Sequence, residues 1–291
     1  MGCISCVGLL RESAVEGDEV ILRLKEERSI PIEADRVCPD HFVGRSRAEI
    51  EALPALRGRR KTTLGDLFTV EGEDSDQIVV EGDLRHVKHI GQEMSQGKIT
   101  IHGDVGMHLG AEMRGGEIVV HGNVDAWAGA HMSGGVIQVH GKAGPMLGAA
   151  YPGETRGMRG GVILIDGDAG PRAGERMRRG LIAVRGNLGE FAGARMIAGS
   201  LFVFGALGAR AGAGMKRGTI VALGGVADGL LPVFRYACSY RPSFLRYYLR
   251  RLREWGLPVT PDQMEGIFRR YAGDITTLGK GEILVYDQRR S

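Results

Sequence analysis

The chain has 291 residues, of which 43% are apolar and 25% are charged, and its formal net charge is +3. This composition supports a folded core and excludes a disordered chain, while the 34 glycines within residues 82–225 lack the every-third-residue period of collagen. No apolar run approaches the roughly 20 residues that span a bilayer and no secretory signal is visible, so we expect a cytoplasmic protein with no membrane partner.

Cysteines mark the beginning of the chain. Cys3-x-x-Cys6 and Cys38-x-x-His41 have the spacing of two halves of a zinc site, but 31 residues separate them. The sequence leaves zinc binding by these four residues open, and we assign no metal site. Four cysteines in all are too few for a disulfide scaffold.

A short helix is expected before the central part of the chain. Ser46 and Glu49 have the spacing of a capping box, which predicts a helix that ends near Leu53 and Pro54. We interpret residues 1–74 as a lead-in that caps the next domain.

Residues 75–229 contain an internal repeat, Gly-(six residues)-Gly-x-x-Met-x-x-Gly. Its methionines are 19 residues apart, except for one step of 26 that places a seven-residue insertion near Tyr151–Arg159. These methionines are Met94, Met113, Met132, Met158, Met177, Met196 and Met215. Three columns of glycines keep the same period and are predicted to be structural corner residues. Within the regular coils they are Gly103, Gly110, Gly116, Gly122, Gly129, Gly135, Gly141, Gly148, Gly167, Gly174, Gly180, Gly186, Gly193, Gly199, Gly205, Gly212 and Gly218.

Each repeat also carries an apolar-polar-apolar triplet such as Ile99-Thr100-Ile101, which predicts a short strand with one buried face. Glycine follows two residues later and permits a sharp corner, by a positive φ or by close backbone approach. Stacked coils of this kind predict an all-β fold, a single-stranded parallel β-helix of about seven 19-residue coils. We expect right-handed coiling because parallel crossovers nearly always have that hand.

Two further columns are candidate sites. The methionines could form a soft-metal ladder, but we expect them to fill the core beside the glycines. His102, His121 and His140 occupy one position on three successive coils, out of phase with the buried residues, and should face outward. A face for a partner or ligand is one interpretation of them; metal binding and plain surface are the others.

Residues 230–291 predict a helical cap and a final strand. Pro242–Trp255 has the apolar spacing of an amphipathic helix, Thr260 begins another, and Glu282–Tyr286 resembles a strand. Four arginines lie mostly off the apolar stripe of the first helix: Arg246, Arg250, Arg251 and Arg253.

Charge differs between the two ends of the chain. Residues 1–81 carry 11 Lys/Arg and 17 Asp/Glu, a net charge of −6, and residues 235–291 carry 11 and 6, a net charge of +5. The basic end could dock an acidic partner or a polyanionic ligand, or be a solvated surface.

Catalytic patterns are not found in the sequence. The Gly-x-Gly strings are corners of the repeat, no Gly-x-Ser-x-Gly elbow is present, and outward carboxylates do not cluster as a polysaccharide-cleaving β-helix would require. We therefore assign no catalytic residue and expect no nucleic-acid partner.

The coil Gly122–Gly135 resembles the glycine-rich β-helix of two families. One is the C-subunit of formylmethanofuran dehydrogenase, with its bacterial counterpart in the formyltransferase/hydrolase complex; the other is the C-terminal domain of the glutamate synthase large subunit. The segments 48–54, 64–68, 271–274 and 279–285 resemble the flanks of the first family. The resemblance covers about residues 18–286; the residues before it have no recognised counterpart, which leaves the true start of the protein open.

The resemblance implies a non-catalytic scaffold subunit in tetrahydromethanopterin-linked one-carbon metabolism, within a complex that acts either as a dehydrogenase (an oxidoreductase) or as a formyltransferase/hydrolase. It implies no cofactor bound by this chain: the methanofuran-type carrier and the metal centres are expected in partner subunits. In that setting the three histidines and four arginines named above become possible contacts for a partner or for the carrier. A glutamate synthase-type spacer and a carbohydrate-active enzyme remain alternatives.

Overall fold

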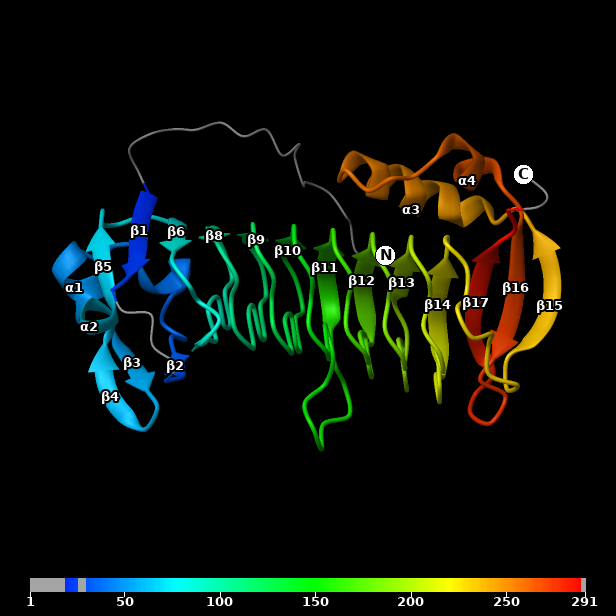
Figure 1. The fold of residues 1–291 in the computed structure, drawn as a ribbon, viewed down its shortest axis with the longest axis horizontal. Helices are drawn as coiled ribbons and strands as arrows, with labels where there is room; N and C mark the ends of the chain where they lie inside the picture. The colour runs from blue at the N-terminus through cyan, green and yellow to red at the C-terminus, as the bar shows by residue number, and fades with distance from the viewer. Residues whose placement is uncertain (1–18, 26–29, 289–291) are drawn as a thin grey trace.

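The computed structural model describes residues 19–25 and 30–288. This part of the chain is mostly β and is dominated by a 13-stranded sheet (Figure 1). In spatial order its strands are β15 (Arg235–Tyr240), β16 (Phe268–Gly273), β17 (Lys280–Tyr286), β14 (Arg217–Ala222), β13 (Ser200–Val203), β12 (Arg179–Val184), β11 (Arg159–Ile165), β10 (Val136–Val139), β9 (Glu117–Val120), β8 (Lys98–His102), β6 (Gln77–Glu81), β1 (Glu19–Leu24) and β5 (Phe68–Glu71).

A smaller sheet and short helices complete the described fold. The sheet consists of β4 (Arg60–Thr63), β3 (Pro54–Arg57), β2 (Ile32–Glu33) and β7 (Val87–Lys88), in that order. The helices are the 3-10 turn η1 (Pro39–His41), α1 (Arg47–Glu51), α2 (Leu64–Leu67), α3 (Ser243–Glu254) and α4 (Pro261–Glu265). None of the described helices is long and apolar enough to cross a membrane.

The repeat forms a continuous parallel ladder from β6 to β14. Ile99 pairs with Ile118, and Ile118 with Ile137, one 19-residue period further on. The 26-residue step appears as the pair Ile137 and Ile163, and the inserted residues loop out between β10 and β11 (Figure 1). The predicted strands and the predicted insertion are confirmed.

A second ladder runs beside the first with the same period. Isolated parallel bridges join one residue per repeat to the next, as in Val105 to Val124 and Val124 to Ala143. Each repeat therefore touches its neighbours at two separate places, and Figure 1 shows the repeats stacked along the long axis of the molecule.

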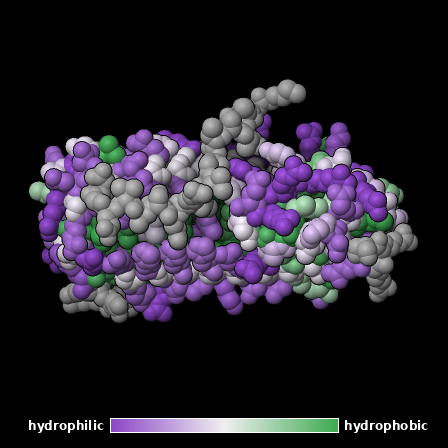
Figure 2. Space-filling model, turned by 90° about the horizontal axis from the view of Figure 1, so that it is seen from above, coloured by the Kyte–Doolittle hydropathy of each residue, from purple (hydrophilic) through white to green (hydrophobic). Residues whose placement is uncertain are grey.

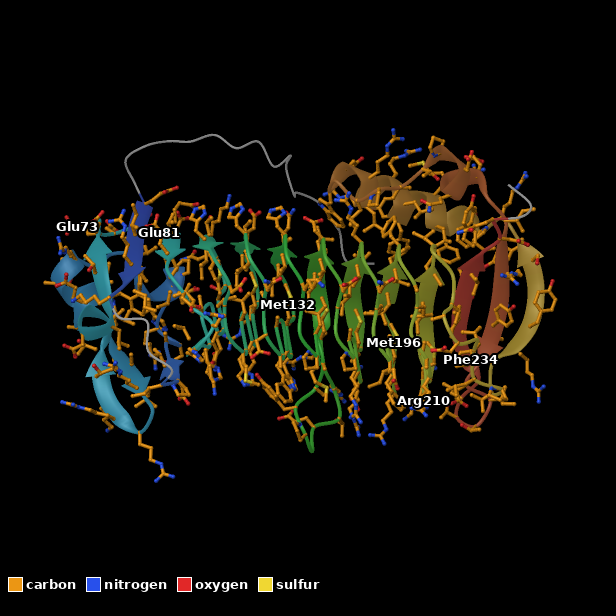
Figure 3. All side chains as sticks on the ribbon, viewed as in Figure 1. Glu73, Glu81, Met132, Met196, Arg210 and Phe234 are labelled. Carbon is orange, nitrogen blue, oxygen red and sulfur yellow. The ribbon has the colours of Figure 1, made fainter. Side chains whose placement is uncertain are left out.

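Each repeat contributes the same kind of side chains to the interior of the stack. All seven repeat methionines are fully buried, among them Met132 and Met196 (Figure 3). A Cβ placed on Gly161 would lie 2.7 Å from Cε of Met132, so each thioether occupies the space that the glycine of the next repeat leaves free. The prediction that these methionines fill the core is confirmed.

Glycine is needed for two different reasons in different columns. Gly110, Gly129 and their equivalents have positive φ values near +60°, in the left-handed region that side chains disfavour. Gly122 has no such φ; a Cβ there would lie 2.3 Å from the carbonyl oxygen of Gly103 on the preceding repeat. Close backbone approach, and not a left-handed corner, explains Gly122 and its equivalents on the later repeats, Gly141, Gly167, Gly186 and Gly205.

The N-terminal side of the stack is closed by β1 and β5. β1 pairs in parallel with β6 and antiparallel with β5, so a strand that the repeat does not predict extends the ladder. The predicted helix is α1, where the Glu49 carboxylate accepts a 2.8 Å hydrogen bond from the Ser46 backbone N–H in a capping box.

At the other end, β17 adds to β14 as one more parallel rung and then continues the sheet antiparallel into β16 and β15. The predicted final strand lies within β17, and the predicted amphipathic helix is α3. Leu245, Leu249 and Leu252 of α3 are buried against the outer face of the sheet. Phe244, which the spacing of apolar residues places on the same stripe, is instead 42% exposed, and its ring meets that of Tyr248 edge-on at 6.5 Å.

Candidate functional site

The three sequence-predicted histidines form an exposed stack at the carboxyl ends of β8, β9 and β10. The ring centroids of His102 and His121 are 4.8 Å apart with planes at 3°, and those of His121 and His140 are 5.2 Å apart at 20°. Parallel strands in register hold the rings at about the strand spacing. All three face outward as predicted.

The stack ends on a carboxylate. Nδ1 of His140 lies 2.7 Å from Oδ2 of Asp166, the residue at the same position on the next repeat. The rings lie parallel and do not converge on one point. Among the residues that the structure describes, no group of three or more His, Cys, Asp or Glu side chains could hold a metal ion.

The outer face of the sheet changes character just beyond this stack. The middle residues of β8 and β10, Thr100 and Gln138, are partly exposed, whereas the equivalent Leu164, Ala183 and Phe202 are buried in the cluster beneath α3. The helix therefore covers only the β11–β14 and β17 side (Figure 1). The histidine stack lies on the side that α3 leaves uncovered.

The four arginines of α3 lie on its outer side, and two are engaged within the cap. Arg246 forms an ion pair with Glu265 of α4. Arg251 pairs with Glu254 at 2.9 Å and its guanidinium lies 5.0 Å from the centre of the Trp255 ring. Arg250 and Arg253 are exposed, and this end of the molecule is mostly hydrophilic when seen from above (Figure 2).

A second ring stack, which was not predicted from the sequence, lies at another corner of the repeats. His89 and His108 are stacked with centroids 4.6 Å apart, and His108 and Trp127 follow at 5.5 Å. All three have φ between +60° and +66°, an unusual conformation for side-chain-bearing residues. They stand two residues before Gly91, Gly110 and Gly129, so aligning the repeats on that column would have revealed them.

The inserted segment binds this second stack through Tyr151. Its hydroxyl is 2.9 Å from Nδ1 of His108, and its backbone N–H donates to Nε2 of His131 at 3.1 Å. Burial, with the nearby His89 and Lys88, lowers the pKa of His108 to about 4, and burial raises the pKa of Tyr151 to about 12. Both rings are therefore uncharged at neutral pH.

Two polar atoms of these stacked rings are buried without a hydrogen-bond partner in the described part of the chain. Trp127 Nε1 and His89 Nδ1 are buried and form no hydrogen bond within residues 19–25 and 30–288. An unpaired buried donor costs about 1–3 kcal/mol. Packing of the stacked rings against Tyr151 holds them there in spite of that cost.

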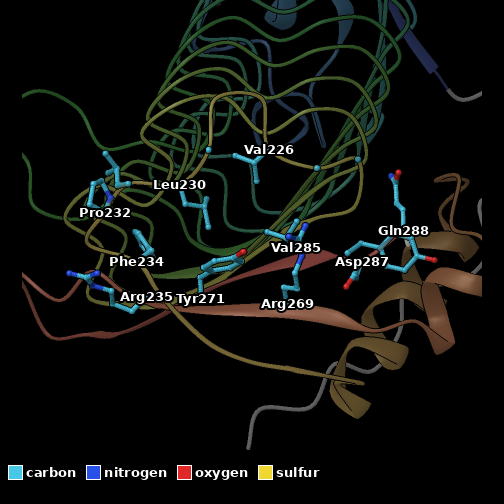
Figure 4. Close-up of a pocket in the computed structure, with 15 residues that line it drawn as sticks. Val226, Leu230, Pro232, Phe234, Arg235, Arg269, Tyr271, Val285, Asp287 and Gln288 are labelled. Atoms are coloured by element: carbon cyan, nitrogen blue, oxygen red, sulfur yellow. The ribbon is translucent and has the colours of Figure 1, made fainter. Parts of the chain in front are cut away.

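A large hollow lies past the last repeat, between the segment 224–234 that follows β14 and the strands β15, β16 and β17 (Figure 4). Its volume is about 780 Å³. Apolar residues such as Val226, Leu230 and Phe234 line it together with Arg235 and Arg269. It combines an apolar floor with two guanidinium groups and contains none of the histidines predicted as contacts.

No family model matches the chain. In a search of solved structures it matches a chain from the X-ray structure of the formyltransferase/hydrolase complex (FhcABCD) of Methylorubrum extorquens with methylofuran. The TM-score is 0.85 and the identity 37%, over 92% of this chain and 100% of that one.

Curated relatives match a shorter stretch of the chain. The chain is 40% identical over 94 residues to the C-subunit of the tungsten-containing formylmethanofuran dehydrogenase 2 of Methanothermobacter wolfeii. It is 40% identical over 101 residues to the C-subunit of the molybdenum-containing formylmethanofuran dehydrogenase 1 of Methanosarcina barkeri. The chain belongs to the family that contains the C-subunit of formylmethanofuran dehydrogenase.

The two kinds of match cover different lengths. The two curated dehydrogenase relatives match 31% and 33% of this chain and 35% and 34% of their own lengths, so the chain spans about a third of each. The solved structure, in contrast, aligns nearly from end to end.

Of the four residues that could form a zinc site by their spacing, the structure describes only Cys38 and His41. Cys3 and Cys6 lie outside the described residues. Cys38 is buried, its thiol is 3.2 Å from Oδ2 of Asp40, and burial raises its pKa to about 12. His41 Nε2 lies 3.0 Å from Nη1 of Arg36, and burial together with that guanidinium lowers its pKa.

Proposed function

We propose that this chain is a non-catalytic scaffold subunit of a formylmethanofuran dehydrogenase or formyltransferase/hydrolase complex, in tetrahydromethanopterin-linked one-carbon metabolism. The observation that carries the proposal is the end-to-end likeness, at a TM-score of 0.85 and 37% identity, to a chain of the FhcABCD complex. The matches to the C-subunits of tungsten- and molybdenum-containing dehydrogenases support the same assignment.

We further propose that the stacked repeats form a right-handed parallel β-helix that acts as a rigid support. Two parallel ladders per repeat and a core of buried methionines and branched aliphatic residues favour stiffness along the stack. Such a support presents side chains in rows, at fixed spacing, to whatever binds along it.

Contacts with partners or with the carrier are proposed at two places. The stacked rings of His102, His121 and His140 offer a row of ring N–H and N groups on a face that α3 leaves uncovered. Arg250 and Arg253 offer two exposed guanidinium groups on α3, which pair well with carboxylates. The methanofuran-type carrier and the metal centres would be held by the partner subunits.

Affinity purification from the native host tests the proposal. A tagged chain should co-purify with a hydrolase-type and a formyltransferase-type subunit, identified by mass spectrometry, and the assembled material should transfer formyl groups. Co-purification of a molybdenum or tungsten subunit would indicate the dehydrogenase form. Recovery with an amidotransferase instead would support a glutamate synthase-type spacer and refute the proposal.

The non-catalytic part of the proposal has its own test. The purified chain alone should not hydrolyse a formyl amide. Turnover that survives removal of all partner subunits, and that is lost when a residue of this chain is substituted, would overturn it.

A further inference from the structure

The seven-residue insertion is the largest departure from the repeat, and its base is fixed in place. Tyr151 is hydrogen-bonded to His108 through its hydroxyl and to His131 through its backbone N–H. At the other end of the loop, the Gly157 N–H donates to the carbonyl oxygen of Arg176 at 2.9 Å. The loop between these anchors is therefore held against the repeats that precede it and those that follow it.

Cationic side chains gather where this loop meets those repeats. Arg156 of the loop, Arg176 and Arg195 of the next two repeats, and Lys216 of the third line one hollow of about 410 Å³. Arg176 and Arg195 occupy the same position on neighbouring repeats, since the N–H of Arg176 donates to Ala194 and the N–H of Arg195 donates to Ala213. Their Cα atoms are thus about 4.8 Å apart along the stack.

The backbone at both arginines is in the left-handed region. Their φ values are +57° and +54°, whereas Gly214 takes the same position on the following repeat with φ +71°. Side-chain-bearing residues lose roughly 1–2 kcal/mol in this conformation, and glycine would avoid that loss. Glu93, Glu112 and His131 take the same position on earlier repeats with φ between +56° and +59°, so the conformation belongs to the repeat and the side chain that it presents changes from acidic to basic along the stack.

The charge of this hollow is not balanced within the described part of the chain. Arg195 approaches Oε1 of Glu175 at 3.7 Å, but that carboxylate is 8% exposed and also serves Arg172. Arg156, Arg176 and Lys216 have no carboxylate partner among residues 19–25 and 30–288. Four cations around one concave surface repel each other unless an anion joins them.

We propose that this groove, formed by Arg156, Arg176, Arg195 and Lys216, binds an acidic segment of a partner polypeptide. Guanidinium groups in a row pair with carboxylates in bidentate fashion. A single-stranded nucleic acid is disfavoured because the residues that line the hollow, Thr155, Ile197 and Gly214 besides the four cations, include no aromatic ring on which a base could stack. The groove is separate from the histidine stack and from α3, and the inference holds whichever complex the chain joins.

Fluorescence anisotropy with a labelled peptide of alternating glutamate and serine tests the groove on the full chain. Removing two cations with Arg176→Gln and Arg195→Gln should raise the dissociation constant about tenfold. The wild-type dissociation constant should also rise as NaCl is increased, since exposed charges are screened by salt.

The matched control is Arg59→Gln with Lys61→Gln, which removes the same charge from the exposed β3–β4 hairpin near the N-terminal end of the stack. It should leave the dissociation constant nearly unchanged. Equal effects of the two double variants would overturn the proposal, because net charge alone would then explain binding. A labelled single-stranded oligonucleotide that binds more tightly than the peptide, with the same dependence on Arg176 and Arg195, would overturn the choice of a polypeptide.

Discussion

Substituting Gly129 by valine should destabilise the stack by an amount that the structure lets us divide into two parts. The backbone φ is +64°, so any side chain there costs about 1–2 kcal/mol. A Cβ would also lie 2.5 Å from Cδ1 of Ile163 on the next repeat, and overpacking of this kind costs about 1–3 kcal/mol. We expect a loss of about 2–5 kcal/mol in the free energy of unfolding.

Gly153 provides the matched control for this substitution. Its φ is +87°, but a Cβ there would meet nothing within 4 Å. Gly153→Val therefore carries the backbone strain without the core contact. The difference between the two valine variants should be about 1–3 kcal/mol, the packing part alone.

Urea unfolding followed by tryptophan fluorescence is a suitable assay, because Trp127 lies in the same repeat as Gly129 and Trp255 reports on the α3 cap. With a slope of about 3 kcal/mol/M, the extra loss corresponds to a midpoint roughly 0.3–1 M lower for Gly129→Val. Coincident midpoints for the two variants would refute the reasoning, because contact between neighbouring repeats would then contribute nothing.

Three other perturbations have defined outcomes. The pKa of His108 is lowered to about 4 in the folded protein, so its contribution to stability should be complete above pH 6.5 and lost as the pH falls towards 4. The urea midpoint of His108→Gln should therefore fall less than that of the wild type when the pH is lowered across that range. Tyr151→Phe removes the hydrogen bond to His108 and should lower the free energy of unfolding by about 1 kcal/mol. Trypsin should then cleave after Arg156 sooner than in the wild type, as followed by mass spectrometry. Unchanged cleavage would argue that Tyr151 does not anchor the loop. Arg250→Glu with Arg253→Glu should slow assembly with partner subunits while stability stays within about 0.5 kcal/mol, and normal assembly with unchanged salt dependence would identify these arginines as plain surface.

The repeat made the central strands predictable, and the strands that were not predicted lie outside it. A strict period identifies the pair Ile118 and Ile137 without any structure, because parallel strands in register repeat their apolar residues. β1 and β5 lie outside the period, and their pairing depends on a chain path that local patterns do not encode.

The candidate site was predictable to a similar degree. The outward stack of His102, His121 and His140 follows from alternation along each strand. The contact between Tyr151 and His108 spans 43 residues and depends on how the inserted loop folds back, which no period describes. The ion pair of Arg246 was likewise not predictable, since it depends on where α4 places Glu265. The pair of Arg251 with Glu254, in contrast, has the i,i+3 spacing that a helix brings together.

The constant register between repeats makes the stack a molecular ruler. Every repeat adds one strand spacing of about 4.8 Å, so the separation between two surfaces on the molecule can change only in whole steps. Removing one 19-residue unit between β8 and β10 would bring the β1–β5 end one step closer to α3 while leaving every remaining pair of strands in register. Partners bound at the two ends would then be held at a distance set by the number of repeats, and that number could change without disturbing either binding surface.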